Sequence, residues 1–188
     1  MLRNWKLQVS VNRTIINNLK DSTVKALKQK FGNIKLLRRS ALPIFLINDS
    51  VEVVVGHDML EIFSDNVDDL INLDVQYILN ICYNSPVILR VDIGNKIIVS
   101  CTDQLKVAKK LNSIVENKVH NGVVMLSSTF GLVKDDDIIV YTIVLNDTGY
   151  HLQLELNGIQ LKDIKSKINE LIELRETPEI VKILNIEE

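Results

Sequence analysis

The sequence predicts an α/β (α+β) protein in which a mixed β-sheet with hairpins is covered by about four helices. Segments of alternating or β-branched residues recur along the chain, and segments with apolar residues at helical spacing separate them. A length of 188 residues is enough for a substantial core. We therefore expect a single domain over residues 1–188.

Residues 86–117 read as strand, turn, strand and helix in immediate succession. Alternation from Val87 to Val91 and the β-branched run after Asn95 predict two strands. Gly94-Asn95 tolerates the positive φ of a tight connection, so we expect a β-hairpin there. The helix that follows is expected to start at Thr102 or Asp103.

The N-terminal part predicts a strand at residues 5–9, a helix from about Val11 to Phe31 that ends at Gly32-Asn33, and further strands at 34–37 and 44–47. The strand at 44–47 is continuously apolar, which favours an interior place in the sheet. The only tryptophan, Trp5, is either a core anchor or a stacking platform for a base, and the core is favoured.

Residues 51–55 and 59–63 predict two more strands, and Ser64-Asp65-Asn66 is expected to cap a helix that reaches Cys82. Cys82 lies on the apolar stripe of this helix and is expected to be a small buried residue. Asp68 and Asp69 suit the helix dipole, but neighbours on a helix point about 100° apart, which disfavours a shared metal or acid/base site.

The C-terminal part predicts a turn at His120-Asn121-Gly122 into a strand at 123–126. Residues 138–145 and 150–156 are expected to pair as a hairpin. A helix from about Lys162 to Arg175 closes the chain before Pro178.

Composition narrows the class of protein. The 46% hydrophobic and 24% charged content is typical of globular proteins. No apolar run reaches the roughly 20 residues of a membrane helix, and the N-terminus lacks the apolar core of a signal peptide. The two cysteines and three histidines show no metal-ligand spacing, so no metal is expected. We expect a cytoplasmic protein without a membrane partner.

The net charge of −2 hides an asymmetry along the chain. Residues 1–40 carry ten basic residues and one acid, whereas residues 41–80 carry eight acids and no Lys or Arg. A basic segment of this kind can hold phosphates. The alternative, which we favour, is a solvated helix face that touches the acidic part of its own domain.

No repeat or linker divides the sequence, which we describe as a basic helical region (1–40), an acidic middle (41–80), a core (86–117) and a closing hairpin and helix (138–175). It contains no GxGxxG, GxxxxGK[ST] or GxSxG motif. Nucleotide binding or hydrolysis by those devices is therefore unsupported.

The segments Ile97–Thr102, Gln104–Val115 and Asn121–Val123, followed by the closing strands and helix, have a familiar order and spacing. From about Phe63 to Leu184 this order resembles the tRNA wybutosine-synthesizing protein 3 family. In that family, strands ending in a His-Val-x-x-Arg pattern precede a helix rich in small and apolar residues and a Ser-Gly-Ile turn.

The resemblance implies methylation of a tricyclic guanosine derivative in phenylalanine tRNA, with S-adenosylmethionine as the methyl donor. The positions that it places near the donor are Ser40, Cys101, Gly122 and Ser127. The positions that it places near tRNA phosphates are Lys20, Lys25, Lys28, Arg38 and Arg39. It implies no particular catalytic residue.

The chain departs from the family pattern where the chemistry is expected. The family's Ser-Ser-Cys-Ser-Gly-Arg signature should fall near residues 38–55, which contain no Cys and lack the needed Gly, and the family's His and Arg correspond to Ile98 and Thr102. Such losses remove hydrogen-bond donors and a cation from a ligand site. They favour a diverged member, with a changed substrate or without catalysis.

Two alternatives to an enzyme remain. One is a non-catalytic paralogue that acts as an RNA-binding or protein-partner subunit. The other is an unrelated α/β protein, such as a binder of small ligands, because sheets covered by helices serve many functions.

Overall fold

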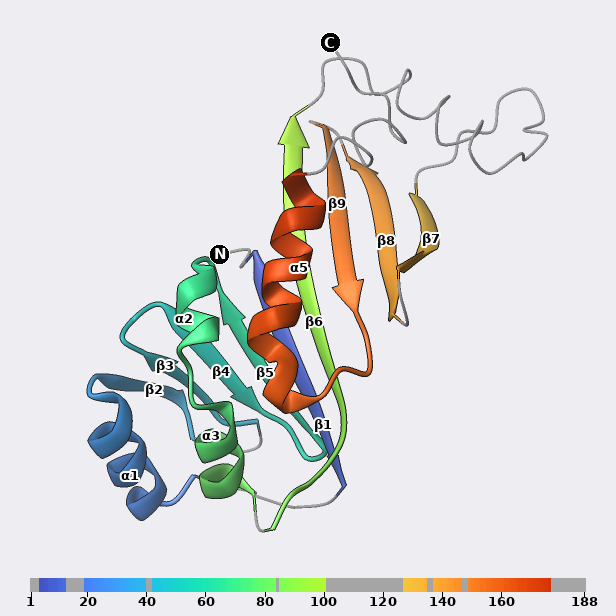
Figure 1. Ribbon diagram of the computed structural model, residues 1–188. Helices are drawn as coiled ribbons and strands as arrows, with labels where there is room; N and C mark the ends of the chain where they lie inside the picture. The colour runs from blue at the N-terminus through green and yellow to red at the C-terminus, as the bar shows by residue number, and fades with distance from the viewer. Residues whose placement is uncertain are drawn as a thin grey trace, which may run out of the picture. The chain divides into compact units, whose positions relative to one another are not determined.

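Nine strands and four α-helices make up the part of the chain that the structure, a computed structural model, describes (Figure 1). That part comprises residues 4–12, 19–39, 42–83, 85–100, 127–134, 137–146 and 149–176. The α+β class is confirmed. Contacts divide the chain into unit 1 (Met1–Gly94 and Asn157–Ile168) and unit 2 (Asn95–Leu156 and Asn169–Glu188). Each unit is described by itself, and the expected single domain stays a prediction.

Unit 1 is a sheet with the strand order β2-β3-β4-β5-β1-β6. Its elements are β1 (Trp5–Asn12), α1 (Asp21–Phe31), β2 (Ile34–Arg38), β3 (Ile44–Ile47), β4 (Val51–Val55), β5 (Met59–Ser64), α2 (Val67–Ile71), α3 (Val75–Cys82) and the first part of β6 (Val87–Ser100). The predicted strands at 5–9, 34–37, 44–47, 51–55 and 59–63 are confirmed. The apolar strand β3 lies inside the sheet, as predicted.

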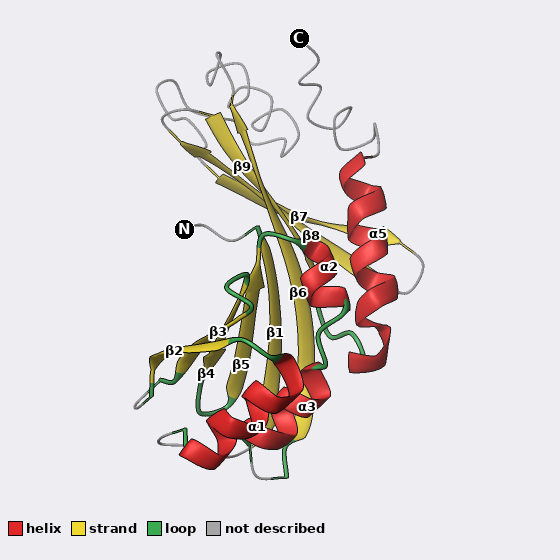
Figure 2. Ribbon diagram, turned by 90° about the vertical axis from the view of Figure 1, so that its left-hand side faces the viewer, coloured by secondary structure: helices red, strands yellow, loops and turns green. Residues whose placement is uncertain are grey.

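One face of this sheet is apolar and carries the helices. Along β1 every second residue is buried, beginning with Trp5 at 4% exposure, so Trp5 is a core residue and not a stacking platform. Figures 1 and 2 show α1, α2 and α3 on the same face of the sheet. The opposite face alternates with it, and there Lys6 pairs with Glu61 at 2.6 Å.

The predicted N-terminal helix is shorter than expected. Val11 and Asn12 belong to β1, residues 13–18 lie outside the described part, and α1 begins at Asp21. Gly32 ends it as predicted, because its φ of 82° is open to glycine and its N–H reaches the Lys28 carbonyl at 2.9 Å.

The predicted helix from residue 67 to Cys82 is divided into α2 and α3. Asn66 caps α2 by accepting from the Asp68 N–H at 3.1 Å, and Asp74 caps α3 by accepting from the Tyr77 N–H at 3.0 Å. A residue that caps a helix cannot also sit inside one, so Asp74 starts a new helix. Cys82 at the end of α3 is fully buried, as predicted.

The predicted hairpin at Gly94-Asn95 is wrong. Both residues lie inside the continuous strand β6, and the burial of Val91 and Ile93 continues at Asn95. The described glycines with positive φ are Gly32 and Gly158, so Gly94 does not take the conformation of a tight hairpin. Pairing of β6 with β1 in unit 1 and with β9 in unit 2 overrides the local turn signal.

Unit 2 contains a sheet with the strand order β6-β9-β8-β7. The strands that join β6 are β7 (Ser127–Lys134), β8 (Asp137–Asn146) and β9 (Gly149–Leu156). The hairpin of β8 and β9 is confirmed, with Ile139 opposite Leu156 and Asn146 opposite Gly149. The sequence did not predict β7. The helix expected from Lys162 is confirmed as η1 (Leu161–Asp163) followed by α5 (Ile164–Glu176), whose residues belong partly to each unit.

The two units share one connectivity although the sequence shows no repeat. In unit 1, β1 lies beside β5, the last of the consecutive strands β3, β4 and β5. In unit 2, β6 lies beside β9, the last of the consecutive strands β7, β8 and β9.

Across the described ranges, no helix combines the length and the apolar character needed to cross a membrane. The structure adds nothing to the expected segments at 102–117, 120–126 and beyond residue 176, because they fall outside those ranges.

Candidate nucleic-acid interface

Helix α1 is held against unit 1 by its apolar side. Leu27 is fully buried, and the ring of Phe31 meets the ring of Tyr77 on α3 edge to face, with centroids 5.8 Å apart. Asp21 in the first turn and Lys28 and Lys30 in the last turn suit the helix dipole. The basic residues of α1 are therefore carried on a helix that is packed against unit 1.

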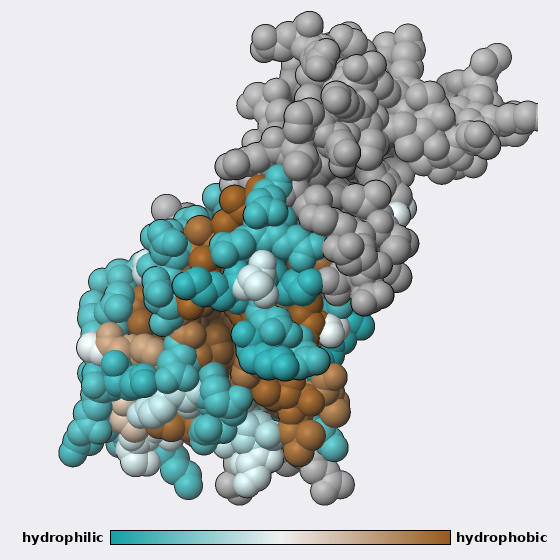
Figure 3. Space-filling view, in the orientation of Figure 1, coloured by the Kyte–Doolittle hydropathy of each residue, from teal (hydrophilic) through white to brown (hydrophobic). Residues whose placement is uncertain are grey.

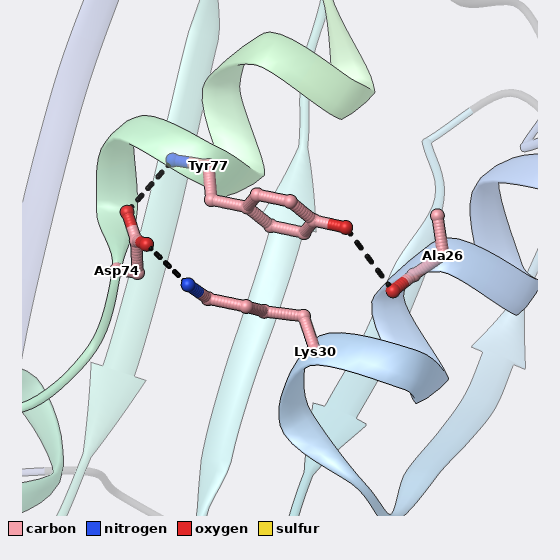
Figure 4. A network of polar contacts seen from close by, with 4 residues as sticks. All are labelled: Ala26, Lys30, Asp74 and Tyr77. Atoms are coloured by element: carbon pink, nitrogen blue, oxygen red, sulfur yellow. Dashed lines mark hydrogen bonds and ion pairs between the residues drawn. The ribbon is translucent and has the colours of Figure 1, made fainter.

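Lys30 uses its charge inside the protein. Its Nζ lies 2.8 Å from Asp74 Oδ2 and 5.2 Å from the centre of the Tyr77 ring (Figure 4). The hydrogen bond and the attraction between the two charges raise the pKa of Lys30. The hydrogen bonds from Lys30 and from the Tyr77 N–H lower the pKa of Asp74. This contact joins the basic helix to the acidic middle of the same unit, as the alternative interpretation of the basic segment predicted.

Three other lysines of this region remain turned to solvent. Lys20 precedes the first turn of α1, and Lys25 and Lys28 lie three residues apart at exposed positions of the helix. Within the described ranges, none of the three forms an ion pair. Their ammonium groups are therefore available to an external anion.

Arg39 belongs to the same surface. The Leu19 N–H donates to the Arg39 carbonyl at 3.1 Å, which holds the end of β2 beside the start of α1. The Arg39 guanidinium lies 2.6 Å from Asp21 Oδ1, so the positive charge of Arg39 already has a negative partner. We call Lys20, Lys25, Lys28 and Arg39 the α1 basic surface. With Asp21 it carries a net charge of +3, four cations less one carboxylate.

Arg38, predicted for the same role, has a different local partner. Its Nε donates to the Leu42 carbonyl at 2.7 Å, and its Cα pairs with that of Ile44 across β2 and β3. The β2 register shifts between Leu36 and Arg38, a bulge that no sequence signal announced. The described contacts do not bring Arg38 to the lysines of α1.

The residues predicted to hold S-adenosylmethionine are not brought together in the described part of the chain. Ser40, Cys101 and Gly122 lie outside the described residues. Ser127 is the first residue of β7, in unit 2, where it pairs with Val144 of β8. These four positions stay predictions.

Acidic residues of unit 1 serve local structure. Asp69 Oδ2 lies 3.5 Å from Ser64 Oγ, and the Asp68 N–H donates to the cap of its own helix. Within the ranges described, no group of His, Cys, Asp and Glu side chains is arranged to hold a metal ion.

No protein-family model matches the chain, and no curated protein matches it.

Proposed function

We propose that this protein is a non-catalytic RNA-binding subunit that contacts tRNA phosphates through the α1 basic surface. The observation that carries the proposal is the contrast within one helix. Lys30 is paired with Asp74, whereas Lys25 and Lys28 are exposed and have no ionic partner among the described residues. Cations that a fold leaves uncompensated on a packed helix suit recognition of a polyanion.

The geometry favours backbone contacts over reading of bases. Lysine is a flexible point charge that attracts phosphate without fixing a sequence. No aromatic ring stands among the four residues of the surface, so stacking of bases has no platform there. We therefore expect binding that depends strongly on salt and weakly on tRNA sequence.

The test is fluorescence anisotropy with labelled tRNA at a series of salt concentrations. The variant Lys20→Gln/Lys25→Gln/Lys28→Gln removes three charges from exposed positions without changing the apolar side of α1. Each lost phosphate contact lowers the magnitude of the slope of log K against log salt by roughly 0.7 to 0.9, so we expect it to fall by about 2 to 2.7, with at least tenfold weaker binding near physiological salt.

Lys6→Gln is the matched control, because it also removes a positive charge from unit 1 but from a residue already paired with Glu61. It should leave tRNA affinity within about twofold. Equal affinities for the triple variant and the wild type would overturn the role of the surface.

The non-catalytic part of the proposal needs a second measurement. S-adenosylmethionine at millimolar concentration should leave the melting temperature unchanged, because only a ligand that binds the native state raises it. A rise in melting temperature together with methyl transfer to tRNA would instead support the enzyme that the family resemblance implies.

A further inference from the structure

Unit 1 contains a cleft where the junction of α2 and α3 faces the start of α5. Its volume is about 520 Å³, within the range of sites that hold small molecules. Figure 3 shows brown, hydrophobic surface in a hollow on this side of the protein. None of the residues of the α1 basic surface lines it.

Six of the ten residues that line the cleft are aliphatic. The break between α2 and α3 places Leu70, Leu73 and Val75 along one wall, and η1 and α5 supply Leu161 and Ile164 on the other. Leu70, Val75 and Ile164 are almost completely buried, so they form a fixed floor continuous with the core. Such walls favour a ligand with an apolar body.

The charges that line the cleft are unbalanced. Asp74 is already occupied, since it pairs with Lys30 and accepts the Tyr77 N–H. Lys162 and Lys165 are exposed, lie three residues apart, and form no ion pair within the described residues. The available charge beside the apolar walls is therefore positive.

We propose that this cleft binds a small amphipathic anion, with its aliphatic part against the leucines and its carboxylate or similar head group at Lys162 and Lys165. An uncharged molecule of the same length would gain the apolar contacts without the charge-assisted hydrogen bonds. The proposal does not depend on RNA binding, because the two lysine sets share no residue.

The probe is octanoate, with octanol as the uncharged analogue of equal chain length, each at up to about 3 mM, a range suited to a ligand with few heavy atoms. Binding is followed by NMR of isoleucine, leucine and valine methyl groups, since six residues of these types line the cleft: Leu70, Ile71, Leu73, Val75, Leu161 and Ile164. Octanoate should shift these methyl signals in a saturable manner.

The variant Lys162→Gln/Lys165→Gln should weaken octanoate binding roughly threefold to tenfold, as expected for two exposed charge contacts, and leave octanol binding unchanged. Lys6→Gln, on a different element, should change neither. Equal binding of octanoate and octanol, shifts spread over methyl groups elsewhere, or an unchanged octanoate affinity in the double variant would overturn the proposal.

Discussion

Lys30 on α1 and Asp74 at the start of α3 lie 2.8 Å apart and join the most basic part of the sequence to the most acidic part. The same carboxylate caps α3 through the Tyr77 N–H, and the Tyr77 hydroxyl donates to the Ala26 carbonyl of α1 at 3.2 Å. Asp74 thus marks the end of the α2–α3 junction and caps the first turn of α3. Through Lys30 it also holds α1 against α3. Figure 4 shows the interactions that join Lys30, Asp74, Tyr77 and Ala26.

The Lys30–Asp74 ion pair should make the free energy of unfolding depend on pH in a specific way. Asp74 has a pKa below its ordinary value in the folded state, so its contribution is present above about pH 4 and is lost as the pH falls through the folded pKa. Lys30 has a raised pKa, so its contribution is complete below its ordinary value and is lost at higher pH. Asp74→Asn keeps an oxygen to cap α3 but removes the charge. Urea unfolding should show that this variant is less stable than the wild type at pH 7 and loses less stability on acidification.

The control for this experiment is a double-mutant cycle with Lys30→Gln. If the two residues act through each other, the second change should cost little once the first is made. Additive effects and parallel pH profiles would show that the pair contributes nothing to stability.

The hydroxyl of Tyr83 should contribute to the stability of the folded protein. It is 2% exposed, and its hydroxyl lies 2.9 Å from the Gly56 carbonyl and 2.8 Å from the Met59 carbonyl, at the connection of β4 and β5. Tyr83→Phe removes the one O–H that these two part-buried carbonyls share and should lower the free energy of unfolding by about 1 to 3 kcal/mol. Chemical denaturation measures the change. Tyr77→Phe, which loses a single longer hydrogen bond, should cost less, and the reverse order would contradict this assignment.

The Cys82 thiol should not react with thiol reagents while the protein is folded. It is fully buried, and burial raises the pKa of its thiol to about 12. In a Cys101→Ser background, the reaction of Cys82 with an aromatic disulfide at pH 8 should be limited by unfolding and accelerate with urea. Complete reaction within minutes in buffer alone would contradict the burial.

Gly32 should be required for the end of α1. Its φ of 82° suits glycine, whereas a side chain there is strained. Gly32→Ala should therefore lower the free energy of unfolding by about 1 to 2 kcal/mol in urea denaturation. Gln29→Ala, an exposed change inside the same helix, should stay within about 0.5 kcal/mol. A tolerated alanine at residue 32 would show that α1 ends by another device.

Sequence patterns identified elements best where local signals and burial agree. Alternation along β1 and the continuous apolar run of β3 matched the observed strands, and Gly32 matched the end of a helix. Sequence patterns failed where the same residue types can occur in two kinds of structure. Gly94-Asn95 has the composition of a turn, yet Asn95 takes a buried place in β6.

The basic segment shows the same limit for the candidate site. Its composition identified a region rich in basic residues. It did not show which of these residues pair with carboxylates of the same protein. Lys30 and Arg39 have carboxylate partners, whereas Lys20, Lys25 and Lys28 have none in the described residues. Only the tertiary structure separates these groups, because both ion pairs join residues far apart in the chain.

The sequence by itself determined the α+β class, most strands of both units, the closing helix and the burial of Cys82, because these follow from hydrophobic period and turn chemistry within a few residues. Only the tertiary structure decided that β6 runs on through Gly94, that Asp74 divides one expected helix into two, and that both units repeat one strand connectivity. The physical reason is that strand pairing and helix packing involve residues distant in sequence, and their combined free energy exceeds a local preference of about 1 kcal/mol.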